Sequence, residues 1–145
     1  MLINNTPHYC SMATDTFKLT IHMVSSLDGI IAKPDNTVSW FETTDIYEKG
    51  VTPTNEEMAA FLKNIDCYVM GARTYEHAME LSKLYGWLYG DVPAIVLTHR
   101  NLQAERENIE FYSGSLDTLV NEQLKPNYNN VWMIGGPKML KNCFV

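Results

Sequence analysis

The sequence predicts an α/β domain with a mainly parallel central sheet and helices on both faces. Short runs rich in apolar and β-branched residues alternate along the chain with longer segments whose apolar residues recur at helical spacing. Two of the runs, residues 92–98 and 131–134, are almost wholly apolar, which is typical of strands covered on both faces. A chain of 145 residues with 46% hydrophobic residues is long enough to bury one core. A single domain is therefore expected.

The N-terminal part of the chain is expected to contain a leader and one strand. Residues 1–16 are polar with little periodicity and are interpreted as a mobile leader, so the domain is expected to span residues 17–145. Residues 17–26 alternate polar and apolar side chains before becoming apolar, as a strand does when its end is buried. Gly29 supplies a permissive turn, and residues 30–39 carry the Pro, Asp and Asn of an exposed loop.

The middle of the chain predicts a helix, a strand and a second helix. Thr54 is a capping side chain, and carboxylates follow it in the first turn, where the helix dipole favours them. Apolar residues at helical spacing extend this helix to about residue 66, and it is expected to pack on the sheet. Residues 67–70 form the next strand, Gly71 turns the chain, and a helix is predicted over residues 74–84.

The C-terminal half repeats this alternation of strands and helices. A helix is predicted from the capping residue Ser115 to about residue 124, followed by a loop over residues 126–130. The predicted strands are residues 92–98, 108–112 and 131–134. Strands separated by helices imply parallel pairing, because each helix returns the chain to the end of the sheet where the previous strand began.

Small or polar residues directly follow the predicted strands, at Gly29, Gly71, Thr98 and Gly135. Because ligands of parallel sheets gather beyond the carboxyl ends of the strands, these residues are expected to line one edge. Residues 71–74 and 135–138 each join a strand end, a glycine and a helix start, which directs backbone N–H groups and the helix dipole towards a phosphate. Arg73 adds a forked set of donors. An ordinary turn with a solvated arginine remains the alternative for residues 71–74 taken alone.

Composition and motifs argue against several other classes of protein. A net charge of −6 does not suit nucleic-acid binding. The three cysteines lack CxxC spacing, which favours a reduced, cytoplasmic protein, and the four histidines lack the spacing of a metal site. No apolar run is long enough for a bilayer, and no secretory signal is present, so no membrane partner is expected. Neither the dinucleotide fingerprint G-x-G-x-x-G nor a P-loop occurs.

Four sequence blocks, in this order, resemble the dihydrofolate reductase superfamily. They are S-S-L-D-G-I-I-A (residues 25–32), V-M-G-A-R-T-Y-E (residues 69–76), P-A-I-V-L-T-H-R (residues 93–100) and V-W-M-I-G-G-P-K (residues 131–138). Within the superfamily, the chain is more similar to the branch of the C-terminal reductase domain of the bifunctional riboflavin-biosynthesis deaminase/reductase. The resemblance extends from residue 17 to the end and implies a dihydrofolate-reductase-like three-layer sandwich.

The resemblance also implies NADPH as the cofactor. The cofactor contacts that it implies are Val24, Ile31 and Ala32 at the nicotinamide, Gly71, Arg73 and Thr74 at the phosphates, Thr98 and Arg100 at the 2′-phosphate and adenosine, and Gly135, Gly136 and Lys138 at the pyrophosphate. A hydroxyl and a guanidinium at residues 98 and 100 suit a phosphate dianion. Family chemistry is hydride transfer from the cofactor to a small-molecule substrate.

The chain departs from this family at two places. In dihydrofolate reductases an acidic residue early in the first long helix holds the pterin, and the matching position falls on or beside Asn55. Because a neutral amide cannot pair with a protonated pterin, dihydrofolate reductase activity is not predicted. The adjacent Glu56 is a substrate candidate or a simple partner of the helix dipole, and Trp40 is expected to form a wall of the substrate pocket.

The second departure is at Val145, where the chain ends although family domains continue with a helix and further strands. The C-terminal strands are therefore expected to be missing, which would leave an open edge on the first strand. Either self-association through that edge, as a homodimer, or a longer protein of which this chain is a portion is expected. The resemblance implies an NADPH-dependent reductase of a small heterocycle, similar to 5-amino-6-(5-phosphoribosylamino)uracil reductases. The alternative is a non-catalytic or truncated NADP(H)-binding member of the family.

Overall fold

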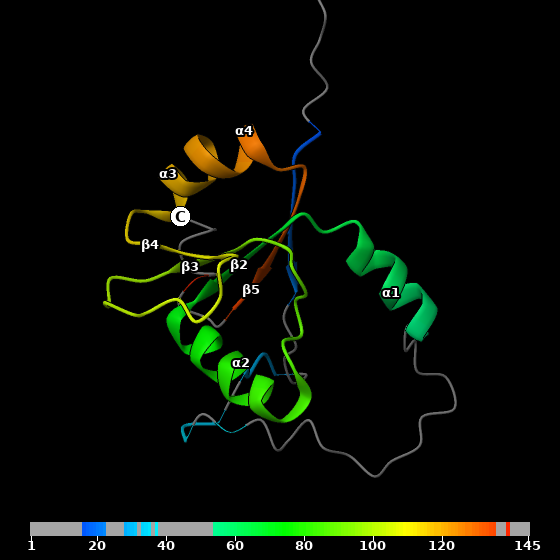
Figure 1. The fold of residues 1–145 in the computed structure, drawn as a ribbon, viewed down its shortest axis with the longest axis vertical. Coiled ribbons are helices and arrows are strands. Elements are labelled where there is room, and N and C mark those ends of the chain that lie inside the picture. The colour runs from blue at the N-terminus through cyan, green and yellow to red at the C-terminus, as the bar shows by residue number, and fades with distance from the viewer. Residues whose placement is uncertain are drawn as a thin grey trace, which may run out of the picture.

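Five strands form one parallel sheet in the order β1-β5-β2-β3-β4 (Figure 1). The computed structural model describes residues 16–22, 28–31, 33–35, 37, 54–135 and 139. The strands are β1 (Lys18–His22), β2 (Cys67–Gly71), β3 (Ala94–Leu97), β4 (Ile109–Tyr112) and β5 (Asn130–Ile134). Every pairing between them is parallel, so the predicted parallel sheet is confirmed. Of the leader predicted for residues 1–16, residues 1–15 lie outside the described residues.

Helices cover both faces of this sheet. The helix α2 (Ala72–Tyr85) lies on one face, while α3 (Leu116–Thr118), the π-helical η2 (Leu119–Leu124) and α4 (Lys125–Asn127) form one continuous segment on the other (Figure 1). The alternation of side chains along a strand explains both contacts, because Val69 packs on the segment of α3 and η2 while Met70 packs towards α2. The predicted three-layer α/β architecture is confirmed.

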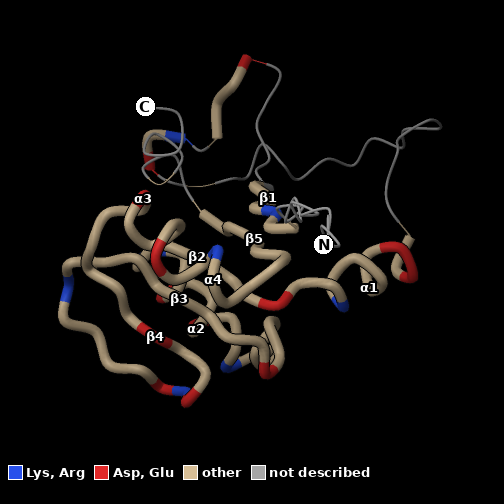
Figure 2. The backbone as a smooth tube through the Cα atoms, turned by 90° about the horizontal axis from the view of Figure 1, so that it is seen from above, with Lys and Arg blue, Asp and Glu red and all other residues tan. Residues whose placement is uncertain are grey.

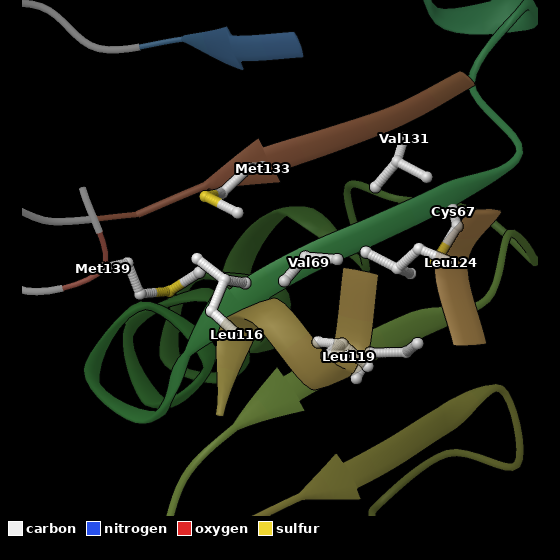
Figure 3. Close-up of a cluster of buried hydrophobic side chains, with 9 residues drawn as sticks. Cys67, Val69, Leu116, Leu119, Leu124, Val131, Met133 and Met139 are labelled. Atoms are coloured by element: carbon white, nitrogen blue, oxygen red, sulfur yellow. The ribbon is translucent and has the colours of Figure 1, made fainter. Parts of the chain in front are cut away.

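The core on the α3 side is built from buried apolar side chains (Figure 3). Leu119 and Leu124 from η2 are both 0% exposed, as are Val69 and Val131 from the two central strands. Burying one such side chain stabilises the fold by about 1.5–3 kcal/mol relative to leaving it in water. This layer holds β2 and β5 in register and thereby sets the positions at which they end.

The helix after β4 is longer than the sequence indicated. Residues 126–127 were predicted to be loop, but the helix continues through Pro126 to Asn127, so that prediction is wrong. Proline lacks the backbone N–H that a helix interior needs, yet it is tolerated in a first turn. Here the π-helical turns end at Leu124, and Pro126 falls in the first turn of the α-helical segment that follows.

The helix α1 (Asn55–Lys63) begins where the sequence predicts, at a complete capping box. Thr54 Oγ1 accepts from the Glu57 N–H at 3.2 Å, and Glu57 Oε2 accepts from the Thr54 N–H at 2.8 Å. The expected packing on the sheet is slight, because no residue of α1 is buried. Phe61 makes an edge-on contact with Trp132 at 5.2 Å, and the rest of the helix projects sideways (Figure 1).

A carboxylate ties the start of β5 to the start of β2. Asp66 Oδ2 accepts from the Asn129 N–H at 2.7 Å, and Oδ1 accepts from the Asn130 N–H at 3.0 Å. The Asp66 N–H in turn donates to the Asn130 carbonyl at 3.0 Å. The side chain therefore satisfies two donors at the point where β5 enters the sheet.

No helix in the described part of the chain is both long and apolar enough to cross a membrane.

Replacing Asp66 by Ala should lower the free energy of unfolding by about 1–3 kcal/mol, because two N–H groups, of which that of Asn130 is part-buried, lose their acceptor. Urea unfolding followed by circular dichroism would measure the loss. The matched control is Asp91→Ala, since the side chain of Asp91 is fully exposed and its removal should cost about 0.5 kcal/mol or less. Equal losses in the two variants would contradict the role given to Asp66.

The strand β1 lies at an edge of the sheet and pairs only with β5 among the described strands. Because the Lys18 N–H donates to the Asn129 carbonyl at 2.7 Å, the alternating backbone directs the N–H groups of Leu19 and Ile21 away from β5. Such an edge is a template for pairing with a second copy of the chain. We therefore expect self-association through β1.

Ile21→Pro should abolish this self-association, because proline removes an outward N–H without removing a hydrogen bond between β1 and β5. Ile21→Val keeps the donor and serves as the control. Static light scattering over a range of protein concentrations would measure the mass. A wild-type monomer, or dimers of equal affinity in both variants, would refute pairing through this edge.

Candidate functional site

The N-terminus of α2 is open, unlike that of α1. The strand β2 runs directly into α2 at Gly71, whose extended backbone occupies the N-cap position without any side-chain capping bond. The first turn of α2 contains no acidic residue, whereas α1 has a capping box and the carboxylates of Glu56 and Glu57. Arg73, which is exposed, lies in this first turn of α2. Backbone N–H groups, the positive end of the helix dipole and one arginine therefore belong to the same helix turn.

The other glycine junction lies beside this one. Met70 of β2 pairs with Ile134 of β5, so Gly71 and Gly135 follow directly after paired residues. A Cβ added to Gly71 would lie 3.3 Å from Met139 Sδ, and one added to Gly135 would lie 3.1 Å from the same atom. Met139 belongs to the buried cluster on the α3 side (Figure 3). Both glycines thus have a packing role, because each makes room for Met139. Their predicted role in binding a ligand stays a prediction.

The end of β3 brings a second arginine to the same edge of the sheet. Leu97 of β3 pairs with Gly71, and Thr98 follows it. Thr98 Oγ1 accepts from the Arg100 N–H at 3.0 Å, which fixes a tight turn, and the Thr98 N–H donates to the Tyr112 carbonyl at 2.8 Å. The hydroxyl predicted to meet a phosphate therefore has a local partner, and its turn directs the Arg100 side chain towards α2.

Glu76 is a member of this group that the sequence interpretation missed. Arg100 Nη1 donates to Glu76 Oε2 at 2.9 Å, and Nη2 donates to Oε1 at 2.5 Å. The hydrogen bond from Arg100 lowers the pKa of Glu76 below its ordinary value, and the charges of Arg100 and Arg73 lower it further. One carboxylate thus lies in the field of both arginines. Arg73 itself forms no ion pair in the described part of the chain.

The remaining predicted residues are less closely grouped. Thr74, half-buried, lies in the first turn of α2 beside Arg73. Ile31 is also partly buried, while Gly29 has a φ of 79° and a Cβ there would meet nothing within 4 Å. Among the described residues, Gly29 is therefore exposed, and a side chain added there would meet no neighbour. The residues outside the described part of the chain are Val24, Ala32, Trp40, Gly136 and Lys138.

The two described substrate candidates lie on a different element. Asn55 and Glu56 occupy the first turn of α1 and are exposed. In Figure 1 the start of α1 lies at the right of the view and the start of α2 at the left. No contact between described residues joins these side chains to Arg73 or Arg100. The structure thus brings together the phosphate candidates and leaves the α1 candidates apart from them.

The described residues give little support for a metal site, a reactive cysteine or a basic binding face. No three His, Cys, Asp or Glu side chains within them gather as a metal site would require. Burial raises the pKa of the Cys67 thiol to about 12, so Cys67 stays neutral and packs as a small apolar side chain. Lys and Arg positions are spread along the described chain among acidic ones, without a continuous basic face (Figure 2). Arg73 and Arg100 near the start of α2 are therefore not part of a larger basic surface in the described chain.

Comparisons with known proteins agree with this fold. No family model matches the sequence. The uncharacterized protein YwjB of Bacillus subtilis (strain 168) is 23% identical over 125 residues, which are 86% of this chain and 67% of YwjB. A crystal structure of a “putative riboflavin biosynthesis protein” from Shewanella sp. PV-4 matches with a TM-score of 0.63 at 21% identity, over 88% of this chain and 71% of that one. At an identity this low, the structural match shows that the two proteins share a fold.

Glu76 should titrate below the ordinary glutamate value of 4.5, and Arg100→Gln should raise its pKa back towards that value. Carbon-13 NMR of the side-chain carboxylates would follow the titration. Because the pKa in the folded state is lowered, the contribution of this pair to stability is complete above about pH 4.5 and disappears as the pH falls through the folded pKa.

Arg106→Gln is the control for this titration, since Arg106 lies against Asp91 and Trp87, and the pKa of Glu76 should not change in that variant. Arg73→Gln should raise the pKa by a smaller amount than Arg100→Gln, because Arg73 acts through its charge alone. An unchanged Glu76 titration in Arg100→Gln would show that the bidentate pair does not persist in solution.

Proposed function

We propose that this chain binds NADPH at the carboxyl edge of its sheet and reduces a small heterocyclic substrate. The observation that carries the proposal is the open N-terminus of α2 with Arg73 in its first turn and Arg100 within reach of the same helix. A dinucleotide needs donors for a diphosphate, and NADPH needs a further cation for its 2′-phosphate. Helix N–H groups suit the diphosphate, and a guanidinium suits the 2′-phosphate.

The described residues fit such a cofactor at its phosphates. The first turn of α2 lacks a carboxylate that would cancel the positive end of the dipole. The hydroxyl of Thr98 and the side chain of Arg100 come from the turn after β3, and Arg73 comes from the turn after β2. These turns meet because β2 and β3 pair in parallel with Gly71 opposite Leu97. The resemblance of the sequence blocks to the dihydrofolate reductase superfamily supports the same assignment.

The substrate class rests on the fold and on that resemblance. The Shewanella protein that shares the fold carries the name of a riboflavin biosynthesis protein, and the sequence blocks are more similar to the pyrimidine reductase branch of the superfamily. We therefore infer a pyrimidine like that of 5-amino-6-(5-phosphoribosylamino)uracil reductases. NADPH would supply the hydride, while the residues of this chain would bind, orient and shield the reactants. The absence of CxxC-spaced cysteines supports a cytoplasmic location for such a protein.

A non-catalytic NADP(H)-binding protein is the second candidate. It is favoured by α1, whose first-turn residues Asn55 and Glu56 are exposed and lie apart from the arginines. A binding protein needs the phosphate donors alone, whereas a reductase also needs a substrate wall beside the nicotinamide. Loss of NADPH absorbance at 340 nm on addition of the pyrimidine substrate distinguishes the two candidates, because a binding protein leaves it unchanged.

Wild-type protein should bind NADPH more tightly than NADH in a fluorescence titration. Arg73→Ala should weaken both cofactors about tenfold, since both carry the diphosphate. Arg100→Ala should weaken NADPH by a similar factor and leave NADH nearly unchanged, because the 2′-phosphate occurs only in NADPH. Arg106→Ala is the control for loss of one positive charge, as Arg106 lies beside Trp87 and Asp91.

Equal affinities for NADPH and NADH in the wild-type protein would refute the role of Arg100. If neither nucleotide binds, the dinucleotide assignment fails as a whole. If Arg106→Ala weakens binding as much as Arg73→Ala, the effect belongs to the overall charge of the protein and the α2 site is refuted.

A further inference from the structure

Arg100 does not have its donors freely available, because Glu76 occupies two of them. The carboxylate oxygens of Glu76 lie 2.9 and 2.5 Å from the two terminal nitrogens of Arg100. This end-on, bidentate geometry is the one that a guanidinium also uses for a phosphate. A phosphate at Arg100 and the carboxylate of Glu76 therefore compete for the same donors.

Exchange between these two partners is feasible because the pair is exposed. The side chain of Arg100 is 54% exposed and that of Glu76 is 42% exposed. Ion pairs in such surroundings add little to stability, since water and salt screen them. Breaking the pair therefore costs little, and a phosphate that carries up to two negative charges attracts the guanidinium more strongly than a carboxylate does.

The charge of Glu76 also acts on Arg73. Arg73 lies three positions before Glu76 on α2, and its charge contributes to the lowered pKa of Glu76. The three side chains together carry a net charge of +1, from Arg73, Arg100 and Glu76. Removal of the Glu76 charge would double this local charge and free the terminal donors of Arg100. The carboxylate thus weakens phosphate binding through occupancy and through repulsion.

We propose that Glu76 is a specificity-determining residue, which competes with the 2′-phosphate of NADPH for Arg100 and so limits the preference for NADPH over NADH. A carboxylate beside the ribose suits the 2′-hydroxyl of NADH, which can donate to it, whereas it repels the 2′-phosphate of NADPH. The Glu76–Arg100 pair therefore holds one group suited to each cofactor. This inference rests on the dinucleotide function proposed above and assigns the origin of its selectivity.

Glu76→Gln tests the inference, because the amide keeps the size of the side chain and removes its charge. The ratio of NADPH to NADH affinity, measured by fluorescence titration at about 50 mM salt, should rise roughly three- to tenfold. The matched control is Glu80→Gln, which removes the same charge one turn further along α2, where Glu80 lies beside His77. Glu80→Gln should leave the ratio unchanged.

Salt dependence and thermal unfolding complete the test. The gain in Glu76→Gln should shrink as salt is raised, because part of it is electrostatic. Thermal unfolding without nucleotide should show that both variants are folded, since both side chains are exposed.

The possible results separate this inference from the proposed function. A lower ratio in Glu76→Gln would mean that Glu76 holds Arg100 in place for the phosphate, which overturns the competition. The same change in Glu76→Gln and Glu80→Gln would assign the effect to overall charge, which also overturns it. Binding of NADPH with an unchanged ratio would refute this inference alone, whereas absence of binding by both nucleotides would refute the proposed function and this inference with it.

Discussion

The insertion of β5 between β1 and β2 is the constraint on which the rest of the described structure depends. The strand β5, the last described strand of the chain, pairs in parallel with both β1 and β2. Without β5, β1 would not be joined to the rest of the sheet. Asp66 accepts from the N–H groups of Asn129 and Asn130, at the start of β5, and aligns this start with the start of β2. Once these starts are aligned, the two strands end together, and Gly71 and Gly135 lie side by side. Strand pairings between segments this far apart in the sequence are slow to form.

The same alignment explains why the donors for a phosphate gather at one edge. Residues at the ends of parallel strands share an edge whatever their separation in sequence. Accordingly, the pairing of β2 and β3 brings Arg100 to Glu76 of α2, which also lies in the field of Arg73. The contrast between the helices adds to this effect. The N–H groups at the start of α1 are satisfied by its own capping box, whereas α2 begins at a glycine without a side-chain cap. Of these two helices, α2 alone has a start that is left available for an external anion.

Local signals in the sequence were sufficient for the order of strands and helices, because apolar periodicity and capping residues act over a few positions. The capping box at Thr54 and the strand-to-helix junction at Gly71 are of this kind. The helical residues around Pro126 were mispredicted because a π-helical segment displaced the start of the last α-helical turn. The Glu76–Arg100 pair joins side chains 24 positions apart, and no periodicity links them. The sequence does indicate that Arg73 and Glu76, three positions apart on one helix, are neighbours. It does not indicate that Arg100 joins them.

The packing of Met139 shows a similar limit. Paired glycines after a strand indicate close approach of some group to the backbone, but the sequence does not say which group. In the structure a buried methionine sulfur approaches both Gly71 and Gly135 from the α3 side. A glycine junction can thus be required by the core and still leave its N–H groups directed elsewhere. The interpretation of such a junction as a ligand site therefore needs a second feature, which here is the uncapped helix with its arginine.

The overall charge of the chain makes these local contacts decisive. A net charge of −6 repels a polyanionic cofactor at long range. At physiological ionic strength this repulsion decays over about 8 Å, whereas N–H groups and guanidinium forks act at contact. Affinity for a phosphorylated nucleotide must therefore come from a few side chains, and a single carboxylate among them changes the balance more than any distant charge. Glu76 is placed where its charge has that effect, because it touches one arginine and lies in the field of the other.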